Sequence, residues 1–372
     1  MGSVITIAAT RFKIGAVPTV VRALAGAALV ICLLVVVLGA YVRLSNAGLG
    51  CPDWPGCYGH LTPAGAAGDA RVLSSTLAGR ALEVGKAWRE MVHRYAAGTL
   101  GLLILSLVFI GTVRRRERIL PLRTTWGLLA IVFAQALLGM LTVTWQLTPL
   151  VVTLHLLLGF STLSMLLWLV LSLPERTQRS RPTPIKAGTA PRARLLALVA
   201  LVALGVQIAL GGWTSSNYAA VACPDFPTCQ AQWWPAGDYR AAFELRGATG
   251  HSYEGGVLDI PARTAIQFTH RLGALVITLV LASAAVSAWR LREHLARRAA
   301  GVVLAALGAQ LIIGISMVLR GFPLWLATAH SAGAACLLMA TVALNRALSN
   351  SPSPGGVSTA PDALPQSCGT SR

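Results

Sequence analysis

The sequence predicts an all-α polytopic membrane protein with eight transmembrane helices, arranged as two fused four-helix bundles that are related by a pseudo-twofold axis along the membrane normal. The composition, the apolar runs and an internal repeat lead to this prediction. The 372 residues are 55% hydrophobic and only 12% charged, whereas a soluble globular protein is about a quarter charged. The abundance of apolar residues excludes a disordered chain, and their long unbroken runs exclude an outer-membrane barrel.

Eight stretches reach the roughly 20 apolar residues that a helix needs to cross a bilayer. The first has no small-residue cleavage site after it, so we expect an uncleaved span and not a signal peptide. The predicted spans are 23–43, 92–113, 125–144, 150–173, 195–213, 266–289, 300–319 and 324–345.

The segments between the spans alternate in charge, which predicts their sidedness. One side, including both termini, carries 20 basic and 4 acidic residues, whereas the remainder carries 11 and 9. The positive-inside rule therefore places both termini in the cytoplasm and the long loops 44–90 and 214–265 outside it. Because the net charge of +18 is explained by topology, we expect no nucleic-acid partner; membrane lipid is the surrounding partner.

The two halves repeat the same features in the same order. A Cys-Pro-Asp-x-Pro-x-Cys loop follows spans one and five, a His-Arg pair opens spans two and six, and a Gln-x-x-x-Gly motif in spans three and seven precedes another His. Each half has four spans, an even number, so both halves begin and end on the same side of the membrane and have the same orientation. We expect an N-terminal half over 1–173, a cytoplasmic linker over 174–194, a C-terminal half over 195–346 and a disordered tail over 347–372.

Four histidines lie at matching positions near the outer ends of the even-numbered spans: His93, His155, His270 and His330. A single histidine in a span is usually an interhelical hydrogen-bonding residue, but four at matched positions favour a function. Two histidines alone make a poor zinc site. Two on facing helices of a bundle can ligate one haem iron from both sides. We prefer one haem per half to zinc or a proton relay, and we expect the other histidines, His60, His251 and His294, to be solvated.

The repeat differs beside the first of these histidines. Glu90 lies three residues before His93, on the same helix face, and its counterpart Gln267 is neutral. This asymmetry suggests that the first half performs chemistry and the second holds a permanent cofactor, although spacing alone favours a simple pairing of Glu90 with Arg94 or Arg89. Arg94 and its counterpart Arg271 are equally compatible with haem propionate partners and with interfacial anchors.

Four of the seven cysteines form two pairs in the outer loops, Cys51 with Cys57 and Cys223 with Cys229. The equal spacing, the turn-forming prolines and the oxidising side of the membrane favour one disulfide in each loop over a shared metal ion. We expect Cys32 and Cys336, which lie in spans, to be packing residues, and Cys368 to lie in the tail.

Together these motifs resemble the haem A synthases, bacterial and mitochondrial enzymes of terminal-oxidase assembly. The resemblance rests on Glu90-Met-Val-His93-Arg94, His155, Thr269-His270-Arg271, His330 and the two cysteine loops, and extends to about residue 346. It implies an oxidoreductase of the bacterial cytoplasmic membrane that oxidises the C8 methyl of haem O to a formyl group by successive hydroxylations.

The resemblance also implies roles for individual residues. His270 and His330 would ligate a resident haem b, and His93 and His155 would hold haem O as substrate. Glu90 would be catalytic, assisting proton removal or stabilising a cation. Haem O synthase (protohaem farnesyltransferase) is the implied protein partner, and a homo-oligomer is left open. Two alternatives are a di-haem b carrier that oxidises quinol, which needs no Glu90, and a transporter, which would have broken helices at midplane.

Overall fold

The structure is a computed structural model that describes residues 17–69, 82–173, 190–245, 252–291 and 293–349. Helices dominate it, and the described residues contain no strand beyond two isolated bridges. The long helices are α1 (Thr19–Leu44), α4 (Val84–Val113), α5 (Leu122–Thr144), α6 (Pro149–Ser172), α7 (Ala190–Ser216), α9 (Ile260–Trp289), α10 (His294–Leu319) and α11 (Leu324–Ser349); short helices are α2 (Pro63–Gly68), η2 (Arg115–Glu117), η3 (Ala220–Ala222) and α8 (Tyr239–Ala242).

The eight long helices are each long and apolar enough to cross a membrane, which confirms the eight predicted spans. Several begin earlier than predicted. Helix α4 starts at Val84 and not at 92, and α9 starts at Ile260 and not at 266. The first turns of these helices carry charged residues that a hydropathy pattern does not recognise as part of a span. At the start of α9 the Asp259 side chain accepts a hydrogen bond from Ala262 N at 3.0 Å, as an N-cap residue does.

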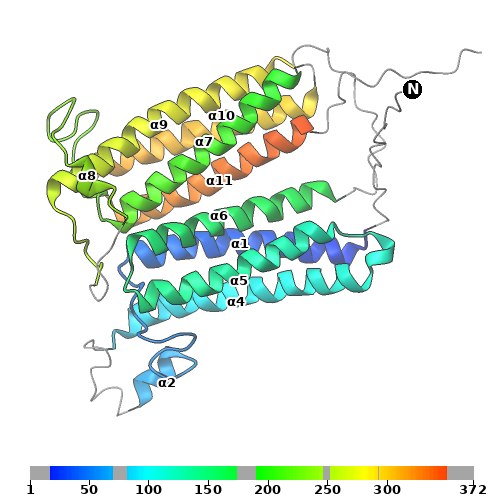
Figure 1. Cartoon of the computed structure of the whole chain (residues 1–372), viewed down its shortest axis with the longest axis horizontal. Coiled ribbons are helices and arrows are strands. Elements are labelled where there is room, and N and C mark those ends of the chain that lie inside the picture. Colours follow the sequence, from blue (N-terminus) through cyan, green and yellow to red (C-terminus); the bar gives the residue numbers. More distant parts are fainter. Residues whose placement is uncertain (1–16, 70–81, 174–189, 246–251, 292, 350–372) are drawn as a thin grey trace, which may run out of the picture.

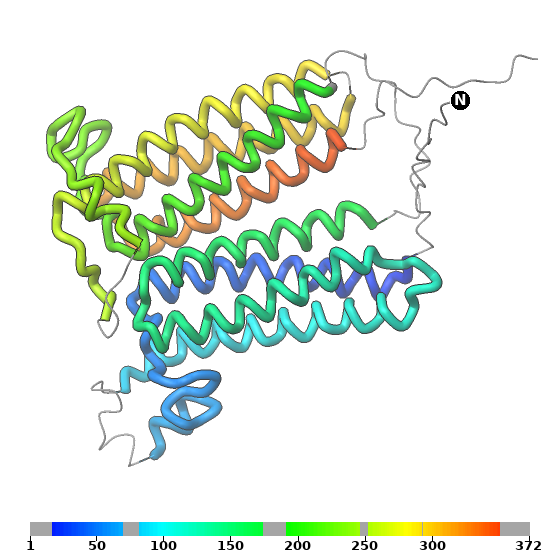
Figure 2. The backbone as a smooth tube through the Cα atoms, in the orientation of Figure 1, coloured from blue at the N-terminus to red at the C-terminus, as the bar shows by residue number. Residues whose placement is uncertain are grey.

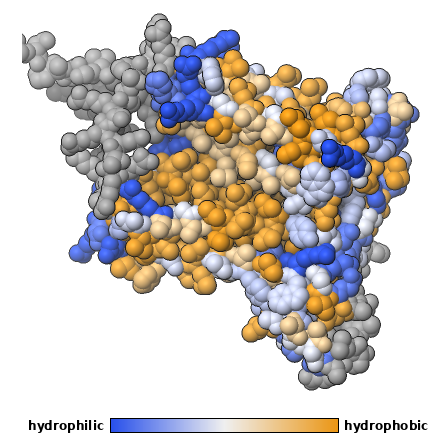
Figure 3. Space-filling view, turned by 180° about the vertical axis from the view of Figure 1, so that it is seen from behind, coloured by the Kyte–Doolittle hydropathy of each residue, from blue (hydrophilic) through white to orange (hydrophobic). Residues whose placement is uncertain are grey.

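The helices lie side by side in two groups (Figures 1 and 2). Helices α1, α4, α5 and α6 contact one another in a ring, and so do α7, α9, α10 and α11. The groups meet where α6 contacts α7 and α11, and where α1 contacts α11. An apolar surface covers the middle of the molecule, and hydrophilic residues gather towards the ends (Figure 3), as expected of helices that cross a bilayer.

One end of the molecule carries the two cysteine loops and the other carries basic residues such as Arg115 and Arg297; we call them the loop end and the basic end. The main hydrophobic core lies towards the basic end. It contains Ile104, Leu163 and Leu281, which are fully buried, and many alanines of α7, α9 and α10. Small residues let membrane helices approach closely, so these alanines suit close contact between the helices of this core.

Polar bonds join the two helix groups at both ends. At the loop end, Arg43 donates to Ser215 O at 2.8 Å, and Tyr218 donates to Asn46 Oδ1 at 2.9 Å. At the basic end, Arg346 donates to Ser172 Oγ at 3.2 Å. These contacts fix the relative position of the groups on either side of the apolar core.

The predicted linker and tail fall largely outside the described residues. Residues 174–189 and 350–372 are not described, and Cys368 and His251 are likewise outside. The described parts are helical: residues 190–194 belong to α7, and residues 347–349 belong to α11. Both helices therefore continue past the boundaries that were drawn where the apolar runs end.

Candidate functional site

The four histidines lie in two pairs at the loop end of the helices. His93 in α4 is close enough to His155 in α6 for the two imidazoles to interact electrostatically, and His270 in α9 interacts in the same way with His330 in α11. All four side chains are half-buried. Each pair therefore brings together imidazoles from two different helices of one group.

Each imidazole ring faces a glycine on a neighbouring helix. A Cβ atom added at Gly39, for example, would come within 2.9 Å of His93 Cε1. Because real Cβ atoms do not approach so closely, a larger residue would displace the ring. The glycine and histidine pairs are Gly39 with His93, Gly139 with His155, Gly211 with His270, and Gly314 with His330.

Two glutamines contact the second histidine pair. Gln207 Nε2 donates to the His270 carbonyl oxygen at 3.0 Å and lies 3.1 Å from His270 Nδ1. Gln310 Nε2 donates to the His330 carbonyl oxygen at 3.1 Å and lies 3.3 Å from the His330 ring nitrogen Nε2. Each glutamine thus joins a histidine's backbone and ring to the adjacent helix.

The ring nitrogens fit the ligation of iron. Within the described part of the chain, the buried Nδ1 atoms of His93, His155 and His330 have no hydrogen-bond partner. Buried polar atoms normally have one, so unpaired ones indicate that a group is missing. No three His, Cys, Asp or Glu side chains among the described residues form a metal cluster. Two imidazoles per group, each in a glycine-lined recess, suit a haem iron with two axial histidines.

Glu90 is held by two groups. It is 5% exposed, accepts a hydrogen bond from Cys51 N at 2.9 Å, and forms an ion pair with Arg94 at 2.5 Å. The pairing with Arg94 that spacing favoured is therefore present. Its counterpart Gln267 is also buried, and its Oε1 has no partner among the described residues. The carboxylate connects the first cysteine loop to α4, and the second group has no equivalent charge.

The two arginines bind the cysteine loops. Arg94 Nη1 donates to the carbonyl oxygens of Asp53 and Gly56, at 2.9 and 2.5 Å. Arg271 donates to Thr228 O and Cys223 O, at 2.7 and 2.8 Å. This loop-binding role was not expected. Pairing with propionates or with lipid headgroups stays a prediction.

The two cysteine loops have the same internal structure. Cys51 is joined to Cys57 by a disulfide, with Cα atoms 4.7 Å apart, and Cys223 is joined to Cys229, with Cα atoms 4.6 Å apart. In each loop an aspartate, Asp53 or Asp225, accepts hydrogen bonds from two backbone N–H groups.

Asp53 accepts from Tyr58 N at 2.5 Å and Gly59 N at 2.9 Å, and Asp225 accepts from Gln230 N at 2.6 Å and Ala231 N at 3.0 Å. Thr228 also donates to Asp225, and these bonds hold the pKa of the Asp225 carboxyl at about 2, well below its usual value. The repeat in sequence is thus a repeat in backbone structure at the loop end.

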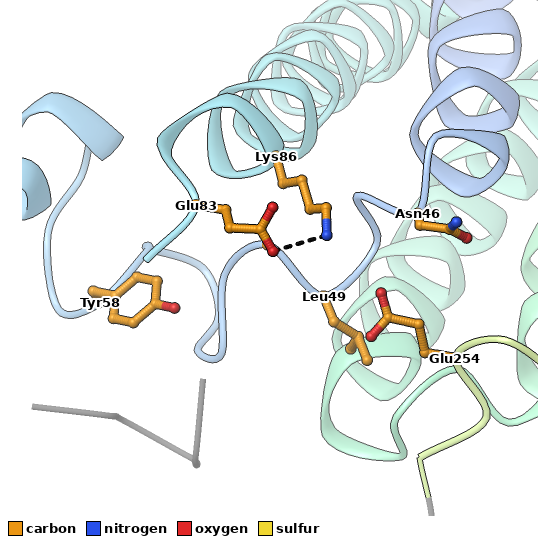
Figure 4. Close-up of a pocket in the computed structure, with 7 residues that line it drawn as sticks. Asn46, Leu49, Tyr58, Glu83, Lys86 and Glu254 are labelled. Carbon is orange, nitrogen blue, oxygen red and sulfur yellow. Dashed lines mark hydrogen bonds and ion pairs between the residues drawn. The ribbon is translucent and has the colours of Figure 1, made fainter. Parts of the chain in front are cut away.

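A polar pocket of about 290 Å³ lies beside the first cysteine loop (Figure 4). Glu83 and Lys86 form an ion pair at 2.8 Å across one wall, and Glu254 enters from the second outer loop. Gly50 lines the pocket and precedes Cys51, whose N–H binds Glu90. The chain around Gly50 therefore lies between this pocket and the buried carboxylate.

The remaining histidines and cysteines differ in their surroundings. His60 pairs with Asp69 at 3.3 Å and is not simply solvated, whereas His294 is exposed, as expected. Cys32 is buried, as expected of a packing residue, but Cys336 is exposed, so its predicted packing role is wrong. The apolar character of a span does not reveal which of its faces is packed, since the exposed face is apolar too.

The sequence analysis did not predict the contact of Gln207 with His270, nor that a glycine on a neighbouring helix faces each histidine ring. Gln207 lies four residues before Gly211, the same spacing as in Gln135 with Gly139 and Gln310 with Gly314. Residues four apart share a helix face, so comparing the odd-numbered spans with one another, as well as one half with the other, could have found it.

Comparison with known proteins agrees with this geometry. A family model described as cytochrome oxidase assembly protein matches residues 22–342. A protein named heme A synthase from Shewanella oneidensis is 42% identical over 320 residues, covering 85% of this chain and 93% of that protein. A protein of the same name from Methylobacterium radiotolerans is 31% identical, covering 85% and 86%, and one from Paracoccus denitrificans is 28% identical, covering 81% of each.

Proposed function

The chain belongs to the family of cytochrome oxidase assembly proteins, and from that premise we propose that it is a haem A synthase, a multi-pass membrane enzyme of haem A biosynthesis. Its substrate is haem O, and its reaction oxidises the C8 methyl group to a formyl group through successive hydroxylations. The observation that carries this proposal is the pair of two-histidine sites at the loop end, with a buried carboxylate beside only one of them. The quinol-oxidising alternative is not favoured, because the relatives are named heme A synthases.

The architecture in this proposal is two fused four-helix halves related by a pseudo-twofold axis, residues 1–173 and 195–346. The two rings of helix contacts and the two alike cysteine loops support it. Both termini lie in the cytoplasm and the disulfide loops outside it, which agrees with the exposed arginines at the basic end. Disulfides persist on that outer side.

The second half holds a resident haem b between His270 and His330. The proximity of His270 to His330 and the glycine that faces each ring support this assignment. When bound, this group supplies one-electron redox chemistry. The protein's contribution is to hold the two imidazoles in place and to keep the site among apolar helices.

The first half holds haem O between His93 and His155, with Glu90 as the catalytic carboxylate. Oxidation of a methyl group to a formyl group adds an oxygen atom, passes electrons to a separate oxidant and releases protons, so a nearby proton acceptor assists the reaction. Glu90 lies one turn before His93 on α4, and Arg94 balances its charge. A buried carboxylate next to the reacting group can take up a proton or stabilise positive charge.

Expression of the protein with haem O tests the proposal. Extracted haems, analysed by mass spectrometry, should contain the formyl porphyrin only when the wild-type chain is present. A membrane preparation that binds two haems per chain but never forms haem A would contradict the proposed reaction and restore the electron-carrier alternative.

A further inference from the structure

We propose that Gly50 is a positioning residue for the carboxylate of Glu90, because its lack of a side chain allows the first cysteine loop to lie directly on the backbone of α4. The inference deepens the proposed function and rests on it, since Glu90 is the carboxylate to which that function assigns the chemistry. It is drawn from a contact that the first loop makes and the second loop replaces by a different one.

The residue before the first cysteine of the loop lies against the first turn of α4. Gly50 is buried, and a Cβ atom added to it would lie 2.7 Å from Lys86 C and 2.8 Å from Ala87 N. Real Cβ atoms essentially never come so close to another heavy atom. Both contacted atoms belong to the helix backbone, which cannot move aside as a flexible side chain can. Glycine is therefore the residue that permits this close approach of loop and helix.

The close approach brings a backbone N–H group to the buried carboxylate. Cys51, the next residue, donates to Glu90 Oε2 at 2.9 Å, and Arg94 donates to the other oxygen, Oε1, at 2.5 Å. Because each oxygen has its own donor, the carboxylate cannot rotate about its last bond without losing a charge-assisted hydrogen bond. The loop and the helix together therefore fix the orientation of the carboxylate.

Arg94 holds the same loop on α4 from its other side. Its Nη1 donates to the carbonyl oxygens of Asp53 and Gly56, while its Nη2 donates to Glu90. One guanidinium thus joins the loop and the carboxylate. Loosening of the loop at Arg94 would also draw the N–H group of Cys51 away from Glu90, so the two supports of the carboxylate depend on each other.

The second loop is attached to its helix in a different way. Ala222 takes the place of Gly50, and its carbonyl oxygen accepts a hydrogen bond from Gln230 Nε2 at 3.0 Å. The same amide donates to Thr264 Oγ1 in α9 at 2.9 Å. A glutamine side chain therefore bridges loop and helix in the second half, where the first half has direct contact between backbones.

The difference is visible at Gln267, the counterpart of Glu90. Its Oε1 is buried and has no hydrogen-bond partner in the described part of the chain, so the N–H group of Cys223 does not reach it. Arg271 donates from both of its terminal nitrogens to carbonyl oxygens of the loop, whereas Arg94 keeps one for Glu90. The support is therefore built in the half that has the carboxylate.

Substitution of Gly50 in the full-length protein tests the proposal. In G50A the added Cβ atom should push the loop away from α4. The rate of haem A formation at saturating haem O should then fall about 10–100-fold, while the affinity for haem O and the spectrum of resident haem b stay unchanged. An unchanged rate in G50A would overturn the proposal.

Two matched controls add or remove a methyl group elsewhere in the loops. G48A lies two residues earlier in the first loop, and its Cβ atom would meet only the side chain of Leu147, which can move. A222G makes the second loop resemble the first at this position. Both variants should form haem A at the wild-type rate. A loss in G48A equal to that in G50A would show a general sensitivity of the loop and would contradict a specific role of Gly50.

A second readout follows the carboxylate itself and needs no turnover. A hydrophobic carbodiimide forms covalent adducts with carboxyl groups, and Glu90 is the one acidic residue of the tryptic peptide 90–94. Mass spectrometry of this peptide should show slow labelling in the wild-type protein and in G48A. Labelling should be faster in G50A, because the displaced loop no longer covers the carboxylate, and E90Q should give no adduct.

A further variant covers the case in which G50A does not fold. R94K keeps a positive charge but lacks the fork of donors that reaches the loop and Glu90 together, so it should also speed the labelling of Glu90. R271K is its matched control in the second half and should leave that labelling unchanged. Wild-type labelling in a folded R94K protein would contradict the support of the carboxylate by the loop.

The positioning role and the proposed function fail separately. A wild-type protein that forms no haem A would refute the proposed function, and the labelling rates would still decide whether Gly50 positions Glu90. Equal labelling of G50A and G48A would overturn the positioning role even if the wild-type protein forms haem A.

Discussion

The first four and the last four long helices share a scaffold and differ in what surrounds the histidines. Both groups have a disulfide loop organised by an aspartate, an arginine that binds the loop's carbonyl oxygens, and two histidines in glycine-lined recesses. Among the described residues, only the first group has a buried carboxylate, Glu90, and only the second has glutamine side chains bonded to its histidines.

The difference shows which parts of the repeat carry the fold and which carry the chemistry. The shared features place a pair of imidazoles at one depth. Under the proposed function, the residues that differ are those that decide whether a porphyrin is held or transformed, and they lie within about one helical turn of the histidines. The following predictions test that division.

Replacement of Glu90 should have the largest effect on the reaction. In E90A, formation of haem A should fall by at least about 100-fold, since proton-transfer groups contribute 10²–10⁴ to rates, and the absorption of resident haem b should remain. The measurement is haem extraction with mass spectrometry, alongside the reduced-minus-oxidised spectrum.

The matched control is Q267A in the second half, which should form haem A normally. If E90A loses its resident haem as well, Glu90 is structural, and the contrast between the halves fails.

Removal of single histidines should separate the two sites. Under the proposed function, H270A and H330A should abolish binding of haem b, because each removes one of the two residues that would hold it, whereas H93A should retain haem b and lose only haem O. A pyridine haemochrome measurement per mole of chain decides this. Loss of the same haem in all three variants would indicate one shared site.

Removal of the disulfides should have unequal effects on function. In the chain-entropy model, opening a loop of this length costs about 2 kcal/mol, so both C51S/C57S and C223S/C229S should be less stable to heat. The first pair should also reduce haem A formation, because Cys51 N–H binds Glu90.

Peptide mapping without reductant, compared with activity, provides the measurement. Each pair should be found bridged within its own loop in the wild-type protein. Equal activity losses in the two double variants would argue against a special link between the first loop and the carboxylate.

The smallest expected effect is the pH dependence of the second loop. Because hydrogen bonds lower the pKa of Asp225 to about 2, the ionised carboxylate stabilises the folded loop above the ordinary aspartate pKa of about 3.9, and this stabilisation is lost as the pH falls through about 2. Protease sensitivity of the loop should therefore be unchanged between pH 5 and 8, and a D225N variant should be cleaved faster throughout that range. A change in wild-type cleavage near pH 6 would contradict this assignment.

The sequence predicts the helices well because apolar runs of membrane length have few alternative structures. It singles out the four histidines and Glu90 as candidates, because the internal repeat separates matched positions from unmatched ones. It does not predict the loop-binding roles of Arg94 and Arg271. Those roles depend on the rotamers of the long arginine side chains at a helix end, where several partners lie within reach and the sequence spacing does not distinguish them.

The contacts of Gln207 and the exposure of Cys336 could not be predicted from the sequence either, for a related reason. Both depend on the rotation of one helix about its axis relative to its neighbours. In an apolar span the hydrophobic pattern scarcely defines that rotation, because lipid-facing and protein-facing residues are alike.

The tight apolar packing near the basic end has a consequence for biogenesis. The alanine-rich contacts that hold the helices together lie away from the histidines. If a porphyrin is bound as proposed, the packing of the helices does not depend on it, and we expect the colourless protein without porphyrin to be folded in the bilayer.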